Sequence, residues 1–354
     1  MPNKKIGLTL GKYAPFHQGH QYVIETALQE MDEVIVIIYD APDVTHIPLN
    51  VRAGWIRKLY PQVRVIEAWN GPTEVGASAA IKEQHERYII DTLGITNVTA
   101  FYSSEFYGEH MSRALHAENR LVDPERKIIP VSATQIRQQP YLYRKYLNPV
   151  VYRDLIVNVV FLGAPSSGKT TLAKRMAEEF QTVWMPEYGR EYWEQHQKNR
   201  RLSAKQLLII AQTHLELEER LLYQADRFLF TDTNSLTTAI FAQYYHGRVD
   251  TELAALASQA SSRYDLVFLC DIDIPYDDTW DRSGETNRTE FQKRIIADLA
   301  LRKIPYFVLS GTLERRVQSV KKIISQYQKF INPIAHVISL YNSCFREESD
   351  GRRA

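Results

Sequence analysis

Residues 163–170 read GAPSSGKT and match the pattern G-x-x-x-x-G-K-[ST] between an apolar run and a helical pattern. In that context Gly163 and Gly168 let the loop curl so that its backbone N–H groups face a triphosphate. The following helix adds the positive end of its dipole. Lys169 supplies a charge for the β- and γ-phosphates, and Thr170 supplies a hydroxyl for Mg²⁺. The segment predicts an ATP site for phosphoryl transfer.

Two carboxylates follow in the same half of the chain. Asp232 ends the apolar run FLFTD, a position from which a carboxylate reaches Mg²⁺ or its water shell, with a helix-capping role as the alternative. Glu187 opens EYGRE and is our first choice, ahead of Asp232, for the base that takes the proton of a substrate hydroxyl.

Three arginines in this half are candidates for phosphate or substrate contacts. Arg190 either clamps the substrate or pairs with Glu194 at i,i+4. Arg282 and Arg288 belong to a charged, aromatic segment at 273–288. They either close over the phosphates as a lid or lie in a solvated loop.

The first half contains two histidines three residues apart, His17 and His20 in GKYAPFHQGH. At the start of a helix both rings can point to one side, and two imidazoles beside unpaired backbone N–H groups make a site for phosphate oxygens. A metal-binding pair is the competing interpretation, but no third ligand is near in the sequence.

A second polar segment, PVSATQIR at 130–137, strengthens this interpretation. It offers Ser132 and Thr134 as helix caps and Arg137 one turn later, while Lys12 adds charge beside the histidines. Hydroxyls, N–H groups and a guanidinium would converge on a second cluster of phosphates, as nucleotidyl transfer requires.

Apolar runs of strand length alternate with helical patterns and would position these motifs. Alternation of this kind predicts parallel sheets, whose ligand crevice lies at the carboxyl ends of the strands. The segment 138–155 has two prolines and no clean periodicity, so we place a domain boundary near residue 150. We therefore expect an α/β protein of two domains, 1–150 and 151–354. The expected strands are 6–10, 33–40, 64–69, 97–104, 155–163, 228–232, 266–271 and 305–310, and the clearest helix is 203–224 with Ser203 as its N-cap.

Composition narrows the function. The net charge is +1 and neither half has a basic excess, which argues against a general nucleic-acid binder. No apolar run reaches the roughly 18 residues of a membrane span, so we expect a cytoplasmic protein. Zinc-ligand spacing is missing, and Cys270 lies in an apolar run that predicts a packed thiol.

The motifs resemble a known family. GKYAPFHQGH with SATQIR is similar to the H-x-G-H nucleotidyltransferases, and within them to the nicotinamide-mononucleotide adenylyltransferases. With the phosphate loop, EYGRE and TDTNSLTT (231–238), residues 5–330 resemble the bifunctional NadR-type proteins. The resemblance implies a Rossmann-like nucleotidyltransferase sheet followed by a P-loop ribosylnicotinamide kinase sheet. It also implies that the chain phosphorylates nicotinamide riboside and adenylylates the resulting mononucleotide to NAD.

The resemblance assigns roles to residues. His17 and His20 would contact the ATP phosphates and stabilise the pentavalent α-phosphorus, while Arg137, Ser132 and Thr134 would hold the β- and γ-phosphates. Thr170 and Asp232 would hold Mg²⁺. Ala133 stands where many superfamily members have a second serine. The kinase ATP would contact Gly163, Ser166, Ser167, Gly168, Lys169, Thr170, Thr171, Arg282 and Arg288. The nucleoside and nucleotide substrates would contact Tyr188, Arg190, Asn234 and Asp278, with Glu187 and Asp232 beside them, and Trp55 or Trp69 would stack on the pyridine ring.

The implied partners are nicotinamide riboside, nicotinamide mononucleotide, ATP with Mg²⁺, and NAD, with no nucleic acid. Because the chain begins at the first strand, we expect it to lack the helix-turn-helix domain that some family members carry. A homo-oligomer and a transient contact with a riboside transporter stay open. Two alternative functions also stay open. One pairs pantetheine-phosphate adenylyltransferase with dephospho-coenzyme-A kinase, and the other is a regulator that binds NAD or ATP without turnover.

Overall fold

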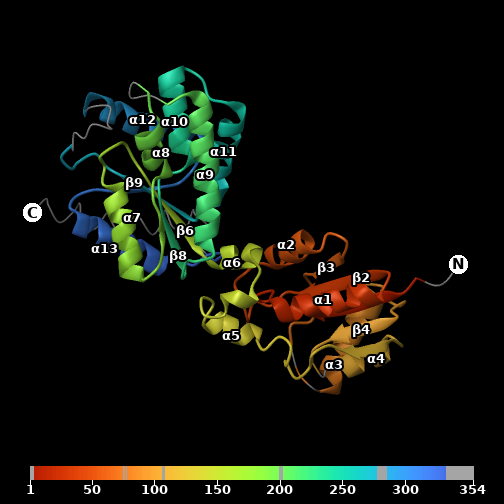
Figure 1. Cartoon of the computed structure of the whole chain (residues 1–354). Coiled ribbons are helices and arrows are strands. Elements are labelled where there is room, and N and C mark those ends of the chain that lie inside the picture. The colour runs from red at the N-terminus through yellow and green to blue at the C-terminus, as the bar shows by residue number, and fades with distance from the viewer. Residues whose placement is uncertain are drawn as a thin grey trace, which may run out of the picture. The chain divides into compact units, whose positions relative to one another are not determined.

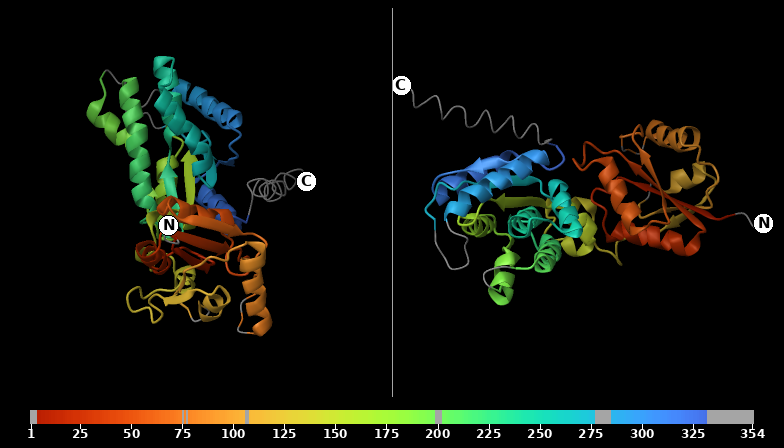
Figure 2. Two further views of the ribbon diagram at one scale, coloured as in Figure 1. Left: turned by 90° about the vertical axis from the view of Figure 1, so that its right-hand side faces the viewer. Right: turned by 90° about the horizontal axis from the view of Figure 1, so that it is seen from above.

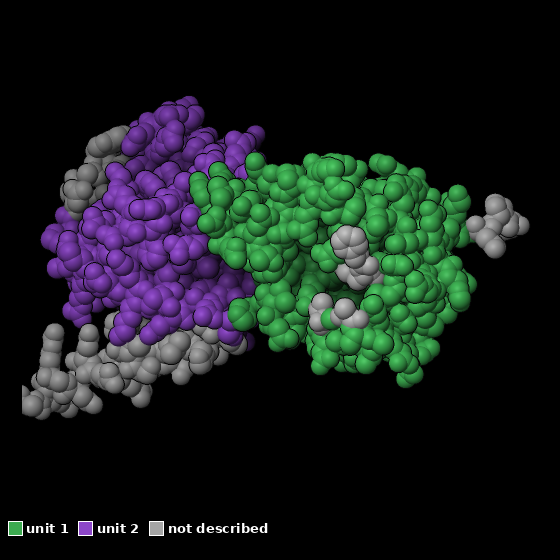
Figure 3. All heavy atoms as spheres, turned by 90° about the horizontal axis from the view of Figure 1, so that it is seen from below, with its two compact units in different colours: residues 1–152 green, residues 153–354 purple. Residues whose placement is uncertain are grey.

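The computed structural model describes residues 4–74, 76, 78–105, 108–198, 202–276 and 285–331. The chain divides into two compact units, residues 1–152 and 153–354 (Figure 3). Each contains a five-stranded sheet in which all strand pairs are parallel. The predicted α/β class with two parallel sheets is confirmed. Within the described residues, no helix has the length and apolar character needed to cross a membrane.

Unit 1 has the strand order β3-β2-β1-β4-β5, with helices on both faces of the sheet (Figure 1). The apolar run EVIVIIY forms β2, which is buried along nearly its whole length because it lies inside the sheet and is covered on both faces. Its strands are β1 (Ile6–Gly11), β2 (Glu33–Tyr39), β3 (Arg64–Ala68), β4 (Ala100–Ser103) and β5 (Glu118–Leu121). Its helices are α1 (Gln18–Glu30), α2 (Leu49–Leu59), α3 (Ala79–Arg87), α4 (Gly108–Ala114), α5 (Ala133–Gln138) and α6 (Pro149–Leu155), which continues into unit 2.

Two short helical turns complete unit 1. A π-helical turn, Tyr88–Thr92, extends α3, and a 3₁₀ turn, Arg144–Tyr146, precedes α6. The core on one face of the sheet combines Leu8, Ile37 and Phe101 with Met111 of α4 and Ile89 of the π-helical turn. Helices α1 and α2 contact the strands β1 to β4.

Unit 2 has the strand order β10-β9-β6-β8-β7. The central strand β6 is apolar and almost fully buried, and it leads directly into the phosphate-binding segment. Its strands are β6 (Val157–Leu162), β7 (Trp184–Met185), β8 (Phe228–Asp232), β9 (Leu266–Cys270) and β10 (Phe307–Leu309). Its helices are α7 (Lys169–Phe180), α8 (Tyr188–His196), α9 (Ala204–Leu222), α10 (Ser235–His246), α11 (Thr251–Arg263), α12 (Glu285–Leu301) and α13 (Leu313–Gln326).

Helices lie on both faces of the second sheet (Figure 2), and an apolar cluster packs on each face. Leu172 of α7 and Val320 of α13 pack on one face, while Ile240 of α10 and Ile295 of α12 pack on the other. Cys270 is a buried free thiol, as predicted. Ser203 caps α9 through a capping box with Gln206, also as predicted, so this long helix begins where the sequence indicates.

Candidate active sites

The segment 163–170 turns from β6 into α7 and lines a cavity of about 540 Å³ in unit 2. Gly163 has φ +145°, and a Cβ there would lie 2.7 Å from the carbonyl oxygen of Cys270. Gly168 has φ +82° and forms the N-cap of α7. Only glycine adopts both conformations without strain, so the loop curls as predicted and brings the N-terminus of α7 to the cavity.

Three side chains distant in sequence hold this loop through its backbone. Gln292 of α12 accepts a hydrogen bond from the N–H of Ala164 (2.9 Å). Arg288 donates from Nη2 to the carbonyl oxygen of Ser166 (3.0 Å), and Arg316 of α13 donates from Nη1 to that of Ser167 (2.7 Å). All three side chains are buried. These contacts engage the carbonyls of Ser166 and Ser167 and the N–H of Ala164, and they fix the course of the loop.

This arrangement changes the interpretation of Arg288. The sequence offered a phosphate-closing lid or a solvated loop, whereas Arg288 is 3% exposed and binds the carbonyls of Ser166 and Ile274. It supports the loop from α12. Arg282 and Asp278 lie outside the described residues. No motif in the sequence marks Gln292 or Arg316, because their partners are backbone atoms that a sequence pattern cannot identify.

Asp232 lies at the end of β8, fully buried beside the phosphate loop. Its Oδ2 accepts a hydrogen bond from Thr170 Oγ1 (2.5 Å), and its Oδ1 is buried without a partner among the described residues. Burial and the nearby Glu187 carboxylate raise the pKa of Asp232 to about 6. The capping alternative is wrong, because α10 is capped by Asn234, whose Oδ1 accepts from the N–H of Leu236.

These two residues fit a magnesium ion. Mg²⁺ prefers oxygen ligands and usually keeps waters and phosphate oxygens in its coordination shell. The Thr170 hydroxyl and the unpartnered Asp232 Oδ1 supply such oxygens beside the loop. The residues the structure describes contain no group of three or more His, Cys, Asp or Glu side chains suited to a metal. Protein ligands alone would therefore not complete the shell.

The remaining predicted kinase residues divide into two groups. Lys169 donates from Nζ to the carbonyl oxygen of Ala164 (3.0 Å) and lines the cavity. Tyr188 does not line it, and instead packs into the apolar cluster of α8, α9 and α10. The predicted residues that also line the cavity are Gly163, Ser166, Ser167, Gly168, Thr170, Thr171, Glu187, Arg190 and Asn234.

The sequence did not predict the residues that line this cavity away from the phosphate-binding segment 163–170. Apolar and aromatic side chains gather there, accompanied by the polar side chains of His214, Thr233, Thr237 and Thr238. The helical spacing of α9 places Leu207, Ile210 and His214 on one face, but the sequence does not show which face meets a cavity. The aromatic side chains at these walls are Trp193, Phe241, Tyr245 and Phe291.

In unit 1, the two histidines line a cavity of about 420 Å³ at the N-terminus of α1. His17 Nδ1 accepts from the N–H of Gly19 (3.1 Å), and His20 Nδ1 accepts from the N–H of His17 (3.3 Å). The rings stack with centroids 3.7 Å apart, so both point to one side as predicted. Because each Nδ1 accepts a hydrogen bond, a neutral ring carries its proton on Nε2.

Electrostatics favours these neutral rings. Burial lowers the pKa of His17 to about 4, and burial and the neighbouring His17 lower that of His20 well below its usual value. Arg126, which also lines the cavity, adds to both shifts. At neutral pH the pair therefore offers two Nε2–H donors. Nothing in the sequence pattern pointed to Arg126.

Arg137 joins the two motifs of unit 1. It donates from Nη1 to the carbonyl oxygen of Ala14 (2.6 Å) and from Nη2 to Thr134 Oγ1 (3.0 Å). Ser132 is the N-cap of α5, as predicted, in a capping box with Gln135. Thr134 lies inside the helix and contacts Arg137, so its predicted capping role is wrong. All three predicted residues line the same cavity as Lys12 and the histidines.

A buried arginine that the sequence did not indicate fixes the ends of the first two strands. Arg52 of α2 is fully buried, donates to the carbonyl oxygens of Lys12, Tyr39 (2.9 Å) and Ile47 (3.0 Å), and pairs with Asp40 (3.3 Å). It holds the backbone of Lys12 beside the histidines. Its only sequence signal is a polar residue in the helical pattern of α2.

Neither predicted tryptophan lines the cavity of unit 1. Trp55 is packed in the core, 2% exposed, and Trp69 is 55% exposed with its Nε1 bonded to Glu67. The aromatic walls are instead Tyr13, Tyr22 and Tyr39, with His85. Stacking on a planar ring would therefore fall to these side chains.

Comparison with known proteins gives the class of each unit. Residues 8–139 match the family model described as cytidylyltransferase-like, and residues 158–316 match the AAA domain model. The chain is thus built from a nucleotidyltransferase-like unit and a P-loop unit of the AAA type.

Relatives of the whole chain make the comparison more specific. The trifunctional NAD biosynthesis/regulator protein NadR of Escherichia coli K12 is 27% identical over 86% of this chain and 78% of its own length. The protein of the same name from Salmonella typhimurium LT2 is 26% identical over 91% and 84%. A NadR structure with NAD and AMP-PNP covers 91% of this chain and 96% of its own, with 22% identity and a TM-score of 0.54, which shows a shared fold. The chain is a homologue of the NadR proteins, and the resemblance its motifs indicate is confirmed.

Proposed function

We propose that this chain makes NAD from nicotinamide riboside in two ATP-dependent steps. Unit 2 phosphorylates the riboside, and unit 1 adenylylates the resulting mononucleotide. The observation that carries the proposal is that each unit has a cavity lined by the predicted cationic and hydroxyl side chains. The names of the two relatives support NAD biosynthesis. A second NadR structure, solved with NR, supports the riboside as a ligand.

In unit 2 the 5′-hydroxyl of the riboside attacks the γ-phosphorus, the bond to ADP breaks, and a carboxylate takes the hydroxyl proton. Glu187 suits this role better than Asp232. Glu187 lines the cavity, whereas Asp232 is fully buried and bonded to Thr170. Thr170 and Asp232 would hold Mg²⁺, which supplies charge neutralisation when bound. Lys169 and the N-terminus of α7 hold the transferring phosphates.

In unit 1 the 5′-phosphate of the mononucleotide attacks the α-phosphorus of ATP and releases pyrophosphate. His17 and His20 donate from Nε2 to the phosphoryl oxygens, where charge develops in the transition state. Arg137, with Ser132 and Thr134, holds the β- and γ-phosphates, and Lys12 adds positive charge. Because Arg137 also binds the carbonyl of Ala14, it keeps the triphosphate in register with the histidines.

The test is a product balance on the purified full chain with nicotinamide riboside and Mg·ATP. We expect ADP and pyrophosphate to form in a ratio near one to one per NAD once the mononucleotide reaches steady state. If NAD forms only when mononucleotide is supplied, unit 2 is not a riboside kinase. If mononucleotide forms but NAD does not, nicotinamide mononucleotide is not the substrate of unit 1. Turnover of pantetheine phosphate, or binding of ATP without any turnover, would favour one of the two rival functions.

A further inference from the structure

His214 of α9, like Ser167, Thr233 and Thr237, lines the kinase cavity and has a buried side-chain polar atom without a hydrogen-bond partner among the described residues. Its side chain is 5% exposed, and its Nε2 is buried without a hydrogen-bond partner among the described residues. Burying an imidazole nitrogen without a partner costs free energy, so such an atom suggests a missing partner. Burial lowers the pKa of His214, so the ring is neutral near pH 7.

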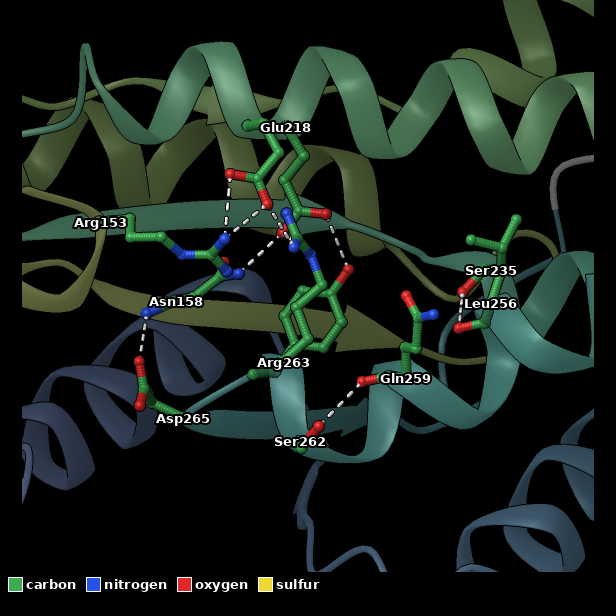
Figure 4. Close-up of polar contacts among 11 residues, drawn as sticks. Arg153, Asn158, Glu218, Ser235, Leu256, Gln259, Ser262, Arg263 and Asp265 are labelled. Atoms are coloured by element: carbon green, nitrogen blue, oxygen red, sulfur yellow. Dashed lines mark hydrogen bonds and ion pairs between the residues drawn. The ribbon is translucent and has the colours of Figure 1, made fainter. Parts of the chain in front are cut away.

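The neighbours of His214 on its far side do not supply that partner. His214 also lines a smaller cavity of about 350 Å³, whose polar contacts Figure 4 shows. There Glu218, one turn later on α9, accepts hydrogen bonds from Asn158 Nδ2 (2.7 Å), Arg263 Nε (3.2 Å) and Tyr264 OH (2.9 Å). This network joins α9 to β6 and α11 and fixes the face that bears His214.

His214 lines the same cavity as Glu187 and the phosphate loop. The Glu187 carboxylate adds to the raised pKa of Asp232 and, after Glu218, partly opposes the lowering of the His214 pKa by burial. Interactions of this kind weaken with distance, so Glu187 lies close to both residues. Asp232 contacts Thr170 of the phosphate loop, and Glu187 and His214 line the same cavity as that loop.

The apolar and aromatic walls of the cavity suit a planar base, which leaves the sugar for the polar positions near Glu187. A sugar hydroxyl can both donate and accept, so it satisfies Nε2 in either neutral tautomer of histidine. We propose that His214 Nε2 hydrogen-bonds a ribose 2′- or 3′-hydroxyl of the acceptor nucleoside and thereby selects ribosides over deoxyribosides. This inference rests on the proposed kinase function of unit 2.

The test compares His214→Phe and His214→Gln with the unchanged full chain, using nicotinamide riboside and its 2′-deoxy and 3′-deoxy analogues. Loss of one hydrogen bond to a buried group should lower kcat/KM for the riboside about tenfold in His214→Phe. The unchanged chain should disfavour one deoxy analogue by a similar factor, and His214→Phe should no longer do so. His214→Gln, which keeps a polar atom near Nε2, should retain part of the preference. Gln212→Leu, on the Glu252-facing side of α9, is the matched control and should change nothing.

The outcomes separate the two proposals. If the unchanged chain phosphorylates no nucleoside, the kinase function fails and this inference fails with it. If it phosphorylates the riboside and His214→Phe keeps both the rate and the preference, only the role of His214 is overturned. Equal loss toward the riboside and both analogues, with an unchanged melting temperature, would show that the ring shapes the cavity without contacting a hydroxyl. If His214→Phe does not fold, the test uses the preference of His214→Gln for the riboside over its deoxy analogues. A preference equal to that of the unchanged chain would then overturn the role of His214.

Discussion

Replacing Arg316 by methionine should show how far the phosphate loop depends on a side chain outside its motif. Arg316 is 3% exposed and binds the carbonyl oxygens of Ser167 (2.7 Å), Gly311 (3.0 Å) and Asp271 (3.2 Å). It also pairs with Asp273. Methionine fills similar space but leaves these oxygens without the guanidinium donors.

The magnitude follows from what remains buried. Breaking a buried ion pair by removing one partner costs about 3–5 kcal/mol. The Asp273 side chain is 32% exposed and can recover water, so we expect the lower end, about 3 kcal/mol in the free energy of unfolding of unit 2. For a unit of this size that corresponds to a melting temperature lower by about 6–12 °C. The KM for ATP in riboside phosphorylation should rise, because the Ser167 carbonyl loses its anchor, while adenylylation of added mononucleotide should persist.

Lys321→Met on the same helix is the matched control. Lys321 is 41% exposed and pairs with Glu179 at the surface, where such a pair contributes at most about 1 kcal/mol. Calorimetry and both activity assays on the two variants provide the comparison. A melting temperature for Arg316→Met as high as that of Lys321→Met would refute the energetic reasoning. A lowered melting temperature with an unchanged KM for ATP would refute the role in placing the loop.

Three further predictions concern the proposed sites. Lys169→Ala should abolish riboside phosphorylation and spare adenylylation of mononucleotide, and His20→Ala should do the converse; comparable loss of both activities in either folded variant would contradict independent sites. The pKa of His17 is about 4 in the folded chain and ~6.5 in the unfolded chain. Between these pH values the unfolded chain binds a proton that the folded chain does not. The free energy of unfolding should therefore fall as the pH drops from 6.5 to 4, by as much as about 3 kcal/mol. Denaturant unfolding across this range should show that slope, and a slope unchanged in His17→Asn would contradict it. Trp69→Ala should keep kcat/KM for mononucleotide within about twofold, because Trp69 does not line the cavity. Tyr22→Ala, at the cavity wall, should lower kcat/KM about fivefold through lost ring contact. A larger loss in Trp69→Ala than in Tyr22→Ala, measured in steady-state assays, would show that the tryptophan contacts the pyridine ring after all.

The sequence was sufficient for eight of the ten strands in the described residues and for most residues that line the two cavities, but the short edge strands β5 and β7 were missed. Buried runs such as EVIVIIY and VNVVFL fix the central strands, and the glycines of 163–168 and the pair His17 and His20 are tied to local backbone geometry. The sequence did not predict the role of a residue where that role depends on which side of a helix or strand faces the cavity. Tyr188 and Gly189 are adjacent on α8, yet only Gly189 lines the cavity. Trp55 lies on α2 and Trp69 directly follows β3, and neither lines the cavity of unit 1.

The missed residues share a physical reason for being missed. The sequence did not mark Gln292, Arg316 or Arg52, and it gave Arg288 a different role. All four bind backbone atoms of segments that line the cavities, and most of their partners are carbonyls or N–H groups that every residue carries. A motif records the side chains and glycines that meet the ligand, because those must be of particular types. The supporting contacts need only a long polar side chain arriving from another helix. A P-loop motif therefore indicates where phosphate binds, whereas the rigidity of the loop depends on α12 and α13, more than 100 residues later in this chain.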